Sequence, residues 1–233
     1  MTEDDPLGPL DPDFAAKFKR DDKRPPCQLY LISPLDVTGG FPDRLARALD
    51  ASEDGAGPVA AFQFRIKDVD QHEAARLAEP LQRLCADRTV AFIVNDSISL
   101  AKRLGADGVH LGQEDGDPRE ARSALGPDAQ VGVTCHDSRH LAMEAGEAGA
   151  DYVAFGSFYP TTTKAVKHRP EPVILSWWSA LFEVPAVAIG GITPANAAPL
   201  VAAGADFLAV SHAVWGSDEA AAVRAFAEVL GTN

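Results

Sequence analysis

Polar side chains alternate with apolar ones in the segment 63–67, directly after a run of apolar residues. In an extended chain Gln63, Arg65 and Lys67 share one face, and Phe64 and Ile66 share the other. A guanidinium or ammonium group costs several kcal/mol to bury without a partner. An inward Arg65–Lys67 pair therefore needs an anion or a carboxylate beside it, and these two residue types suit a phosphate group.

Acidic residues follow the next two apolar runs. Asn95 and Asp96 end one run, and the sequence Gly-Gln-Glu-Asp at 112–115 follows the other. Carboxylates at neighbouring strand ends could together hold Mg²⁺, which commonly binds one or two carboxylates, with water and substrate phosphate completing its shell. The alternatives are that these are ordinary turn and helix-cap residues, or that Asp96 neutralises the basic pair described above.

Three later segments offer groups that bind phosphate. Residues 156–164 read Gly-Ser-Phe-Tyr-Pro-Thr-Thr-Thr-Lys and supply hydroxyl groups, backbone N–H groups and a cation. Residues 190–194 read Gly-Gly-Ile-Thr-Pro, where glycine allows close backbone approach and threonine can cap a helix. Ser211 and His212 follow the last apolar run. The alternatives are a solvated threonine-rich loop and a purely structural helix start.

His136 and His140 have a spacing that can bind zinc, but no third ligand accompanies them in the sequence, so we interpret them as surface residues. Cys135 has no pattern of a nucleophile with its base around it, and we interpret it as a packing residue.

The strands and helices that would position these polar segments follow a repeating pattern. From Gln28 onward, short β-rich runs alternate with helical stretches rich in alanine and leucine, which is typical of successive β-α units around a parallel sheet. The predicted strands are Gln28–Ile32, Val59–Arg65, Val90–Val94, Gly108–Leu111, Gln130–Val133, Tyr152–Phe155, Ala186–Ile189 and Phe207–Val210. This count predicts a single (β/α)8 TIM barrel, an α/β fold whose active site lies at the C-terminal ends of the strands. An open doubly wound sheet is the alternative, but the glycine-rich dinucleotide fingerprint after the first strand is missing.

A tripeptide Gly-Ala-Asp occurs at 105–107, 149–151 and 204–206, each time between a helical stretch and an apolar run. Glycine can end a helix in the left-handed conformation, and aspartate suits a tight turn. We therefore predict a structural role for these three aspartates.

Composition limits the class of protein. The 233 residues fit one domain, and no apolar run is long enough for a membrane span. The three cysteines are widely spaced, which favours a cytoplasmic protein over a disulfide-bonded one. A formal net charge of −13 argues against nucleic acid as the main partner. Residues 1–27 are rich in charge and proline and are predicted to form a poorly ordered or surface-wrapping arm before a barrel domain at 28–233; a partner-binding tail is the alternative.

The chain resembles the thiamine-phosphate synthase family from about Gln28 to Val214. The resemblance is carried by Gln63-x-Arg65-x-Lys67, Asn95-Asp96, Gly112-Gln113-Glu114-Asp115, Pro160-Thr161-x-Thr163-Lys164 and Gly190-Gly191-Ile192-Thr193, in order at successive predicted strand ends. It implies a cytoplasmic transferase that joins a hydroxymethylpyrimidine diphosphate to a thiazole phosphate with Mg²⁺, releasing thiamine phosphate and pyrophosphate. The implied partners are these phosphorylated pyrimidine and thiazole molecules, without nucleic acid or membrane, and a homo-oligomer is compatible with the sequence.

The resemblance also implies a role for each matching residue. It assigns the pyrimidine diphosphate to Gln63, Arg65, Lys67, Asn95 and Lys164, with Thr134 helping to place the pyrimidine. It assigns Mg²⁺ to Asp96 and Asp115. It assigns the thiazole phosphate to Thr161, Thr163, Gly191, Ser211 and His212.

In the mechanism that we expect, Arg65, Lys67 and Lys164 stabilise the charge that develops on departing pyrophosphate, and the thiazole nitrogen captures a pyrimidine cation without a protein nucleophile. Two rival functions remain open at this point. One is a thiazole phosphate tautomerase on the same scaffold, and the other is a non-catalytic regulatory protein that binds thiamine phosphate.

Overall fold

The computed structural model of the chain describes residues 8, 10, 11, 13, 14, 17, 24–51, 58–161 and 168–231. Eight parallel strands form a closed barrel in chain order. They are β1 (Gln28–Ile32), β2 (Val59–Phe64), β3 (Ala91–Asn95), β4 (Gly108–Leu111), β5 (Gln130–His136), β6 (Tyr152–Gly156), β7 (Ala186–Ile189) and β8 (Phe207–Val210).

Pairing between the first and last strands decides the fold. Leu29 of β1 lies opposite Leu208 of β8, and Tyr30 lies opposite Ala209. An open sheet would leave these two strands as edges, so the TIM barrel is confirmed and the doubly wound alternative is excluded. The predicted strands match the observed ones closely, although β2 ends at Phe64, one residue before the predicted end, and β5 runs on to His136.

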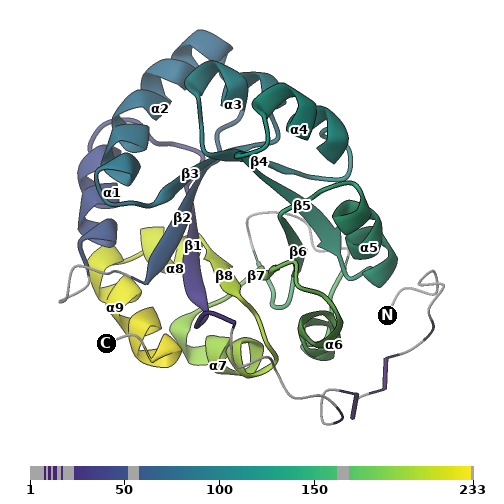
Figure 1. Cartoon of the computed structure of the whole chain (residues 1–233). Coiled ribbons are helices and arrows are strands. Elements are labelled where there is room, and N and C mark those ends of the chain that lie inside the picture. The colour runs from purple at the N-terminus through teal and green to yellow at the C-terminus, as the bar shows by residue number, and fades with distance from the viewer. Residues whose placement is uncertain are drawn as a thin grey trace.

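The helices form an outer ring around the barrel (Figure 1). They are α1 (Phe41–Leu49), α2 (Gln71–Ala86), α3 (Ile98–Leu104), α4 (Pro118–Leu125), α5 (Arg139–Glu147), α6 (Val173–Leu181), α7 (Pro194–Ala202), α8 (His212–Trp215) and α9 (Glu219–Leu230). Several of them begin at a side chain that accepts a backbone N–H of the first turn, namely Asp70, Ser97, Asp117, Ser138 and Asp218. The ring closes where α9 lies between α7 and α1 (Figure 1).

Alternation along the strands separates two hydrophobic cores. Leu29 and Leu31 of β1 point outward and belong to the large core between the barrel and the helices. Tyr30 and Ile32 point inward and belong to a small core with Ile93, Tyr152, Ala154, Val187 and Ala209. The barrel is therefore packed in its middle, and a ligand can be bound only at an end.

The repeated aspartates have the structural role predicted for them. The Oδ2 atoms of Asp107, Asp151 and Asp206 each accept a hydrogen bond from a backbone N–H of the preceding strand, at 2.7, 2.7 and 2.8 Å. Each aspartate precedes an even-numbered strand and fixes the start of the odd-numbered strand before it. Two of the three also pair with an arginine, Asp151 with Arg122 and Asp206 with Arg24.

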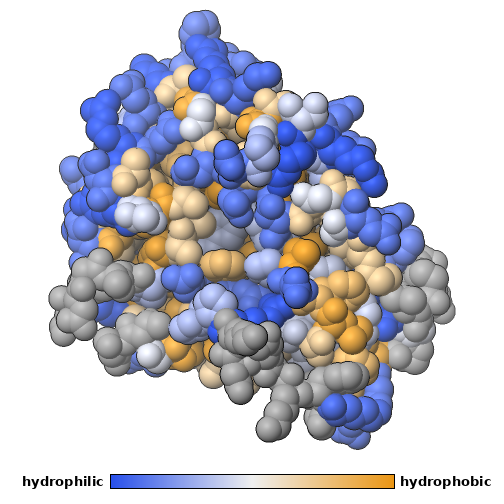
Figure 2. Space-filling view, in the orientation of Figure 1, coloured by the Kyte–Doolittle hydropathy of each residue, from blue (hydrophilic) through white to orange (hydrophobic). Residues whose placement is uncertain are grey.

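The described residues of the N-terminal segment lie against the barrel. The carbonyl oxygen of Gly8 accepts a hydrogen bond from Arg139, and Leu10 and Phe14 pack against the large core. The face of the molecule in Figure 2 is covered largely by hydrophilic residues, with smaller hydrophobic areas between them. Within the described ranges, no helix has the length and hydrophobicity of a membrane-spanning one.

Candidate active site

A layer of inward-facing polar residues covers the small core at the C-terminal ends of the strands. Residues two apart on a strand face the same side, so Gln63 of β2 points inward like Ala61, and Asn95 of β3 points inward like Ile93. His110 of β4 lies opposite Asn95. Gln63 and His110 are buried, whereas Asn95 and Thr134 are half-buried. In a barrel this layer is the floor of the site.

Of the three alternating polar residues, only Gln63 lies within a strand. β2 ends at Phe64, one residue before the predicted end, so Arg65 and Lys67 both lie in the loop after it, and that they face the barrel interior stays a prediction. Arg65 is half-buried there and Lys67 is exposed. The loop is held by Ser33, whose hydroxyl accepts from the backbone N–H of Arg65 and donates to its carbonyl oxygen.

Asp96 and Asp115 lie against each other across the ends of β3 and β4. Partial burial and the neighbouring Asp115 carboxyl raise the pKa of Asp96 from 3.8 to about 6, while the charges of Lys67 and Arg65 act in the opposite direction. Asp96 has φ of +65° and donates its backbone N–H to the carbonyl oxygen of His110 at 2.8 Å. Oδ2 of Asp115 accepts the N–H of Gly112 at 3.0 Å. The structure thus brings together two carboxylates and two cations that are far apart in the chain.

This arrangement fits a magnesium ion. Two carboxyl groups in contact repel each other when both are ionised, and a divalent cation between them removes the repulsion. In the described ranges, no group of three or more histidine, cysteine, aspartate or glutamate side chains could hold a metal ion. Magnesium bound by Asp96 and Asp115 would therefore keep most of its coordination shell for water and substrate oxygens.

The loops after β6 and β7 pack against each other through their backbones. The N–H groups of Phe158 and Tyr159 donate to the carbonyl oxygens of Ile189 and Gly190, at 3.1 and 3.0 Å. Gly191 has φ of +64°, and a Cβ atom there would lie 2.3 Å from the carbonyl oxygen of Pro160. Only glycine allows this approach, so Gly191 is held beside the segment that leads to Thr161.

Other predicted phosphate ligands have the following positions. Thr161 is half-buried at the end of the described part of its loop, whereas Thr163 and Lys164 lie outside the described residues. Ser211 is half-buried and His212 is exposed at the start of α8. The indole Nε1 of Trp215 in this helix donates to the carbonyl oxygen of Ile32, which ties α8 to the end of β1.

His136 differs from its interpretation as a surface residue. It is half-buried at the end of β5, and its ring stacks on that of His168 with centroids 4.7 Å apart. Nδ1 of His168 lies 2.9 Å from Oδ1 of Asp137. His140 is on the surface as expected and pairs with Glu144. The His136–His168 contact connects the end of β5 with the residues that follow the threonine-rich loop after β6.

The floor contains a chain of hydrogen bonds that was not predicted from the sequence. Nε2 of Gln63 donates to the hydroxyl of Tyr30, which bonds to the hydroxyl of Tyr152 at 2.8 Å. The Tyr152 hydroxyl lies 3.2 Å from Nδ1 of His110, and Nε2 of His110 lies 2.8 Å from Oγ1 of Thr134. Burial lowers the pKa of His110 to about 4 and raises the pKa of both tyrosines. The available signal was a polar residue at an inward position of five different strands.

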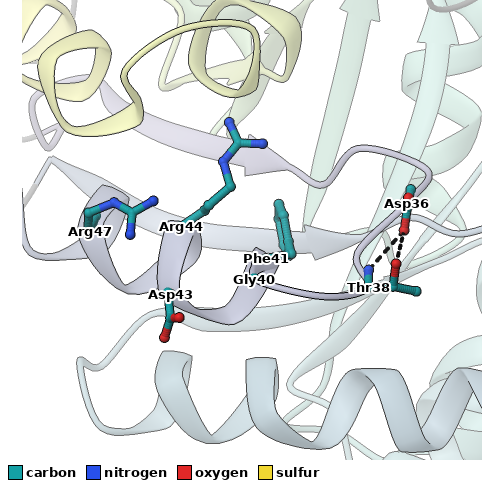
Figure 3. A pocket seen from close by; sticks show the side chains of 7 residues that line it. All are labelled: Asp36, Thr38, Gly40, Phe41, Asp43, Arg44 and Arg47. Carbon is teal, nitrogen blue, oxygen red and sulfur yellow. Dashed lines mark hydrogen bonds between the residues drawn. The ribbon is translucent and has the colours of Figure 1, made fainter.

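A second hollow lies outside the mouth, beside α1 (Figure 3). Asp36 and Thr38 bond to each other at one end of it, and Arg44 points away from them (Figure 3). Arg44 and Arg47 both pair with the buried carboxylate of Glu219, at 3.3 and 2.5 Å. One carboxylate balances only one of the two positive charges, but both guanidinium groups are held against Glu219, and we assign this hollow no role.

Comparison with known proteins decides the family. A family model described as thiamine monophosphate synthase matches residues 29–214, which is more than half of the chain. The chain belongs to the thiamine monophosphate synthase family. The matched residues include every strand of the barrel except the first residue of β1, and the resemblance inferred from the short motifs is confirmed.

Members of the thiamine monophosphate synthase family match over most of their length. The thiamine-phosphate synthase of Erythrobacter litoralis (strain HTCC2594) is 70% identical over 207 residues, covering 88% of this chain and 96% of that protein. The thiamine-phosphate synthase of Rhodospirillum centenum (strain ATCC 51521 / SW) is 55% identical, covering 88% and 98%. The structure of thiamine phosphate pyrophosphorylase from Pyrococcus furiosus superposes with a TM-score of 0.74 at 29% identity, covering 88% and 95%. The expectation of an enzyme on a TIM barrel is thereby confirmed.

Proposed function

We propose that the chain joins a hydroxymethylpyrimidine diphosphate to a thiazole phosphate, giving thiamine phosphate and pyrophosphate, with Asp96 and Asp115 holding Mg²⁺. The observation that carries this proposal is the contact of these two carboxyl groups beside the charges of Arg65 and Lys67. A diphosphate is a single anionic group that can bind a metal ion and two cationic side chains at the same time. The family relationship supports the same reaction.

The cations act on the leaving group. As the bond between the pyrimidine methylene carbon and the diphosphate oxygen breaks, the electron pair of that bond goes to the diphosphate. Arg65 and Lys67 stabilise the added negative charge where it develops, and we assign the same action to Lys164. Bound Mg²⁺ would supply Lewis-acid stabilisation of the same oxygens. The half-buried position of Arg65 strengthens its effect, because water screens it less than an exposed charge.

No protein nucleophile is needed for this substitution. The electron-rich aminopyrimidine can share the positive charge left on its methylene carbon, and the thiazole nitrogen then forms the new bond. Cys135 follows Thr134 in the sequence, but its side chain is buried and burial raises its pKa to about 12. At neutral pH it remains a thiol, which agrees with its interpretation as a packing residue.

The thiazole phosphate fits the opposite side of the mouth. We assign it to Thr161 and Thr163, the Gly191 amide, and the Ser211–His212 turn. The backbone contacts between the β6 and β7 loops support this assignment, since they hold Gly191 and the start of the threonine segment together. Holding both rings in one mouth lowers the entropic barrier to their reaction. We also propose a cytoplasmic location, which suits three buried cysteines that are not in disulfide bonds.

Incubation of the purified protein with both phosphorylated precursors and Mg²⁺ tests the proposal. We expect equimolar thiamine phosphate and pyrophosphate, with no product when either precursor or the metal ion is omitted. Isomerisation of the thiazole phosphate alone would indicate the tautomerase instead. Tight binding of thiamine phosphate without turnover would indicate the regulatory protein.

A further inference from the structure

The hydrogen-bonded floor has two ends, and both are residues assigned to the pyrimidine. Gln63 is the first member and Thr134 is the last, and three buried side chains, Tyr30, Tyr152 and His110, connect them. The five residues come from five strands, β2, β1, β6, β4 and β5. The three connecting residues are buried, so they would act on the pyrimidine through the two ends.

Counting protons shows which group donates in each of these hydrogen bonds. The amide nitrogen of Gln63 can only donate, so the Tyr30 oxygen accepts from it. Tyr30 then has one proton and, among the described residues, one remaining partner, the hydroxyl of Tyr152. Tyr152 accepts that proton and must direct its own to Nδ1 of His110. The opposite direction would leave the Tyr30 proton buried without an acceptor, which is costly.

The same count fixes the tautomer of His110. Its ring is buried, and no carboxylate hydrogen-bonds to it in the part of the chain that the structure describes, so a charged imidazolium would be expensive there. A neutral ring that accepts at Nδ1 carries its proton on Nε2 and donates it to Oγ1 of Thr134. The hydroxyl proton of Thr134 is then directed away from His110.

We propose that this chain of hydrogen bonds sets the specificity of the site for an aminopyrimidine, with Tyr30, Tyr152 and His110 as positioning residues. The proposal rests on the proposed function. With its nitrogen engaged by Tyr30, Gln63 offers its carbonyl oxygen as an acceptor, and Thr134 offers a hydroxyl donor. An aminopyrimidine presents the complementary pair, an amino group that donates and a ring nitrogen that accepts. In the corresponding oxopyrimidine the oxygen accepts and the ring N–H donates, so both groups would meet the wrong partner.

Nuclear magnetic resonance of histidine tautomers tests the direction without a substrate. In protein labelled with ¹⁵N-histidine, with His110 assigned by loss of its signals in His110→Gln, we expect the proton on Nε2. In Gln63→Glu at alkaline pH, the introduced carboxylate can only accept a hydrogen bond from Tyr30. Donor and acceptor then exchange roles in each hydrogen bond of the floor, and the His110 proton moves to Nδ1. A proton on Nδ1 in the unmodified protein, or an unchanged tautomer in Gln63→Glu, would overturn the proposal.

Kinetics test the specificity. The unmodified protein should prefer the amino substrate over its oxo analogue by about 100-fold or more, because two hydrogen bonds are mismatched in the analogue. Tyr152→Phe removes the hydroxyl that bonds to both Tyr30 and His110. It should reduce this preference about tenfold, while KM for the thiazole phosphate stays constant. Ser176→Ala, which removes a hydrogen bond to Ala203 on the outer helices, is the matched control and should leave the preference unchanged.

The outcomes separate the two proposals. An unmodified protein that forms no thiamine phosphate would refute the proposed function. The tautomer measurement would still decide which groups donate in the hydrogen bonds of the floor. An active protein whose preference is the same in Tyr152→Phe would refute only the specificity role.

Discussion

The carboxyl group of Asp96 at the end of β3 lies within hydrogen-bonding reach of that of Asp115 in the loop after β4. The residues between them include all of α3 and β4, so the contact is produced by the pairing of neighbouring strands. It places two carboxyl groups beside the charges of Arg65 and Lys67, and the predictions on activity depend on the proposed cation site there.

Replacing Asp115 by asparagine should weaken the response to magnesium. The Asp115→Asn variant loses one of two carboxylate ligands, so we expect the Mg²⁺ concentration for half-maximal activity to rise by about 100-fold and turnover to fall sharply. Steady-state rates across a Mg²⁺ titration measure both. Asp117→Asn is the matched control, because Asp117 is also exposed in this loop but caps α4. Equal titration curves for the two variants would remove Asp115 from the metal site.

Stabilisation by magnesium should increase with pH. The pKa of Asp96 is about 6 in the folded protein and 3.8 in the reference state, so the folded protein holds this proton more tightly than the unfolded chain does. Its contribution to stability is present at low pH and is lost as the pH rises through about 6, because the ionised pair then repels. Mg²⁺ relieves that repulsion. The rise in Tm on adding Mg²⁺ should be larger at about pH 8 than at about pH 5. A rise that is constant across this range would contradict the assignment of Asp96.

Removing the cation at Arg65 should slow the release of pyrophosphate. We expect Arg65→Ala to lower kcat by about 100-fold, since the half-buried guanidinium stabilises charge in the transition state. Rapid-quench measurement of pyrophosphate formation checks this step directly. Arg76→Ala is a suitable control, because Arg76 makes an exposed pair with Glu73. Comparable rates for both variants would show that Arg65 does not act on the leaving group.

Arg24 should contribute strongly to stability. Its guanidinium pairs with Asp206 at 2.6 Å, and the two side chains are only 12% and 9% exposed. Arg24→Ala removes this cation from a nearly buried carboxylate and should lower the free energy of unfolding by about 3 kcal/mol. Urea unfolding measures the change. Arg83→Ala, which breaks an exposed pair with Glu79, should cost less than about 0.5 kcal/mol. The prediction fails if the two variants unfold at the same urea concentration.

A methyl group at position 132 should disturb the floor. A Cβ atom on Gly132 would lie 2.0 Å from Cζ of Tyr152, whose ring fills the space on the inner face of β5. We expect Gly132→Ala to lower the free energy of unfolding by about 2 kcal/mol through overpacking. Gly146→Ala in α5, where a Cβ atom meets nothing within 4 Å, should instead stabilise the protein by about 1 kcal/mol. Thermal unfolding of both variants compares the signs, and stabilisation by Gly132→Ala would be incompatible with the packing around Tyr152.

The sequence alone determined the elements and the chemistry at their ends. Short β-rich runs between helical stretches identified every strand, for example Gly108–Leu111 and Phe207–Val210, because the preference of a short segment for strand or helix is local. The aspartates of the repeated tripeptide were assigned correctly for the same reason, since turn chemistry is local. The five motifs at 63–67, 95–96, 112–115, 160–164 and 190–193 together indicated the family.

Only the tertiary structure decided what depends on distance between strands. It closed the barrel through β1 and β8, and it moved Arg65 from the predicted strand into the loop after Phe64. It also joined Gln63 to Thr134 through two tyrosines and a histidine. A hydrogen bond between residues more than one hundred positions apart, such as that between Tyr30 and Tyr152, leaves no mark in local composition. Its partners are chosen by the register and inward direction of strands that meet only when the barrel closes.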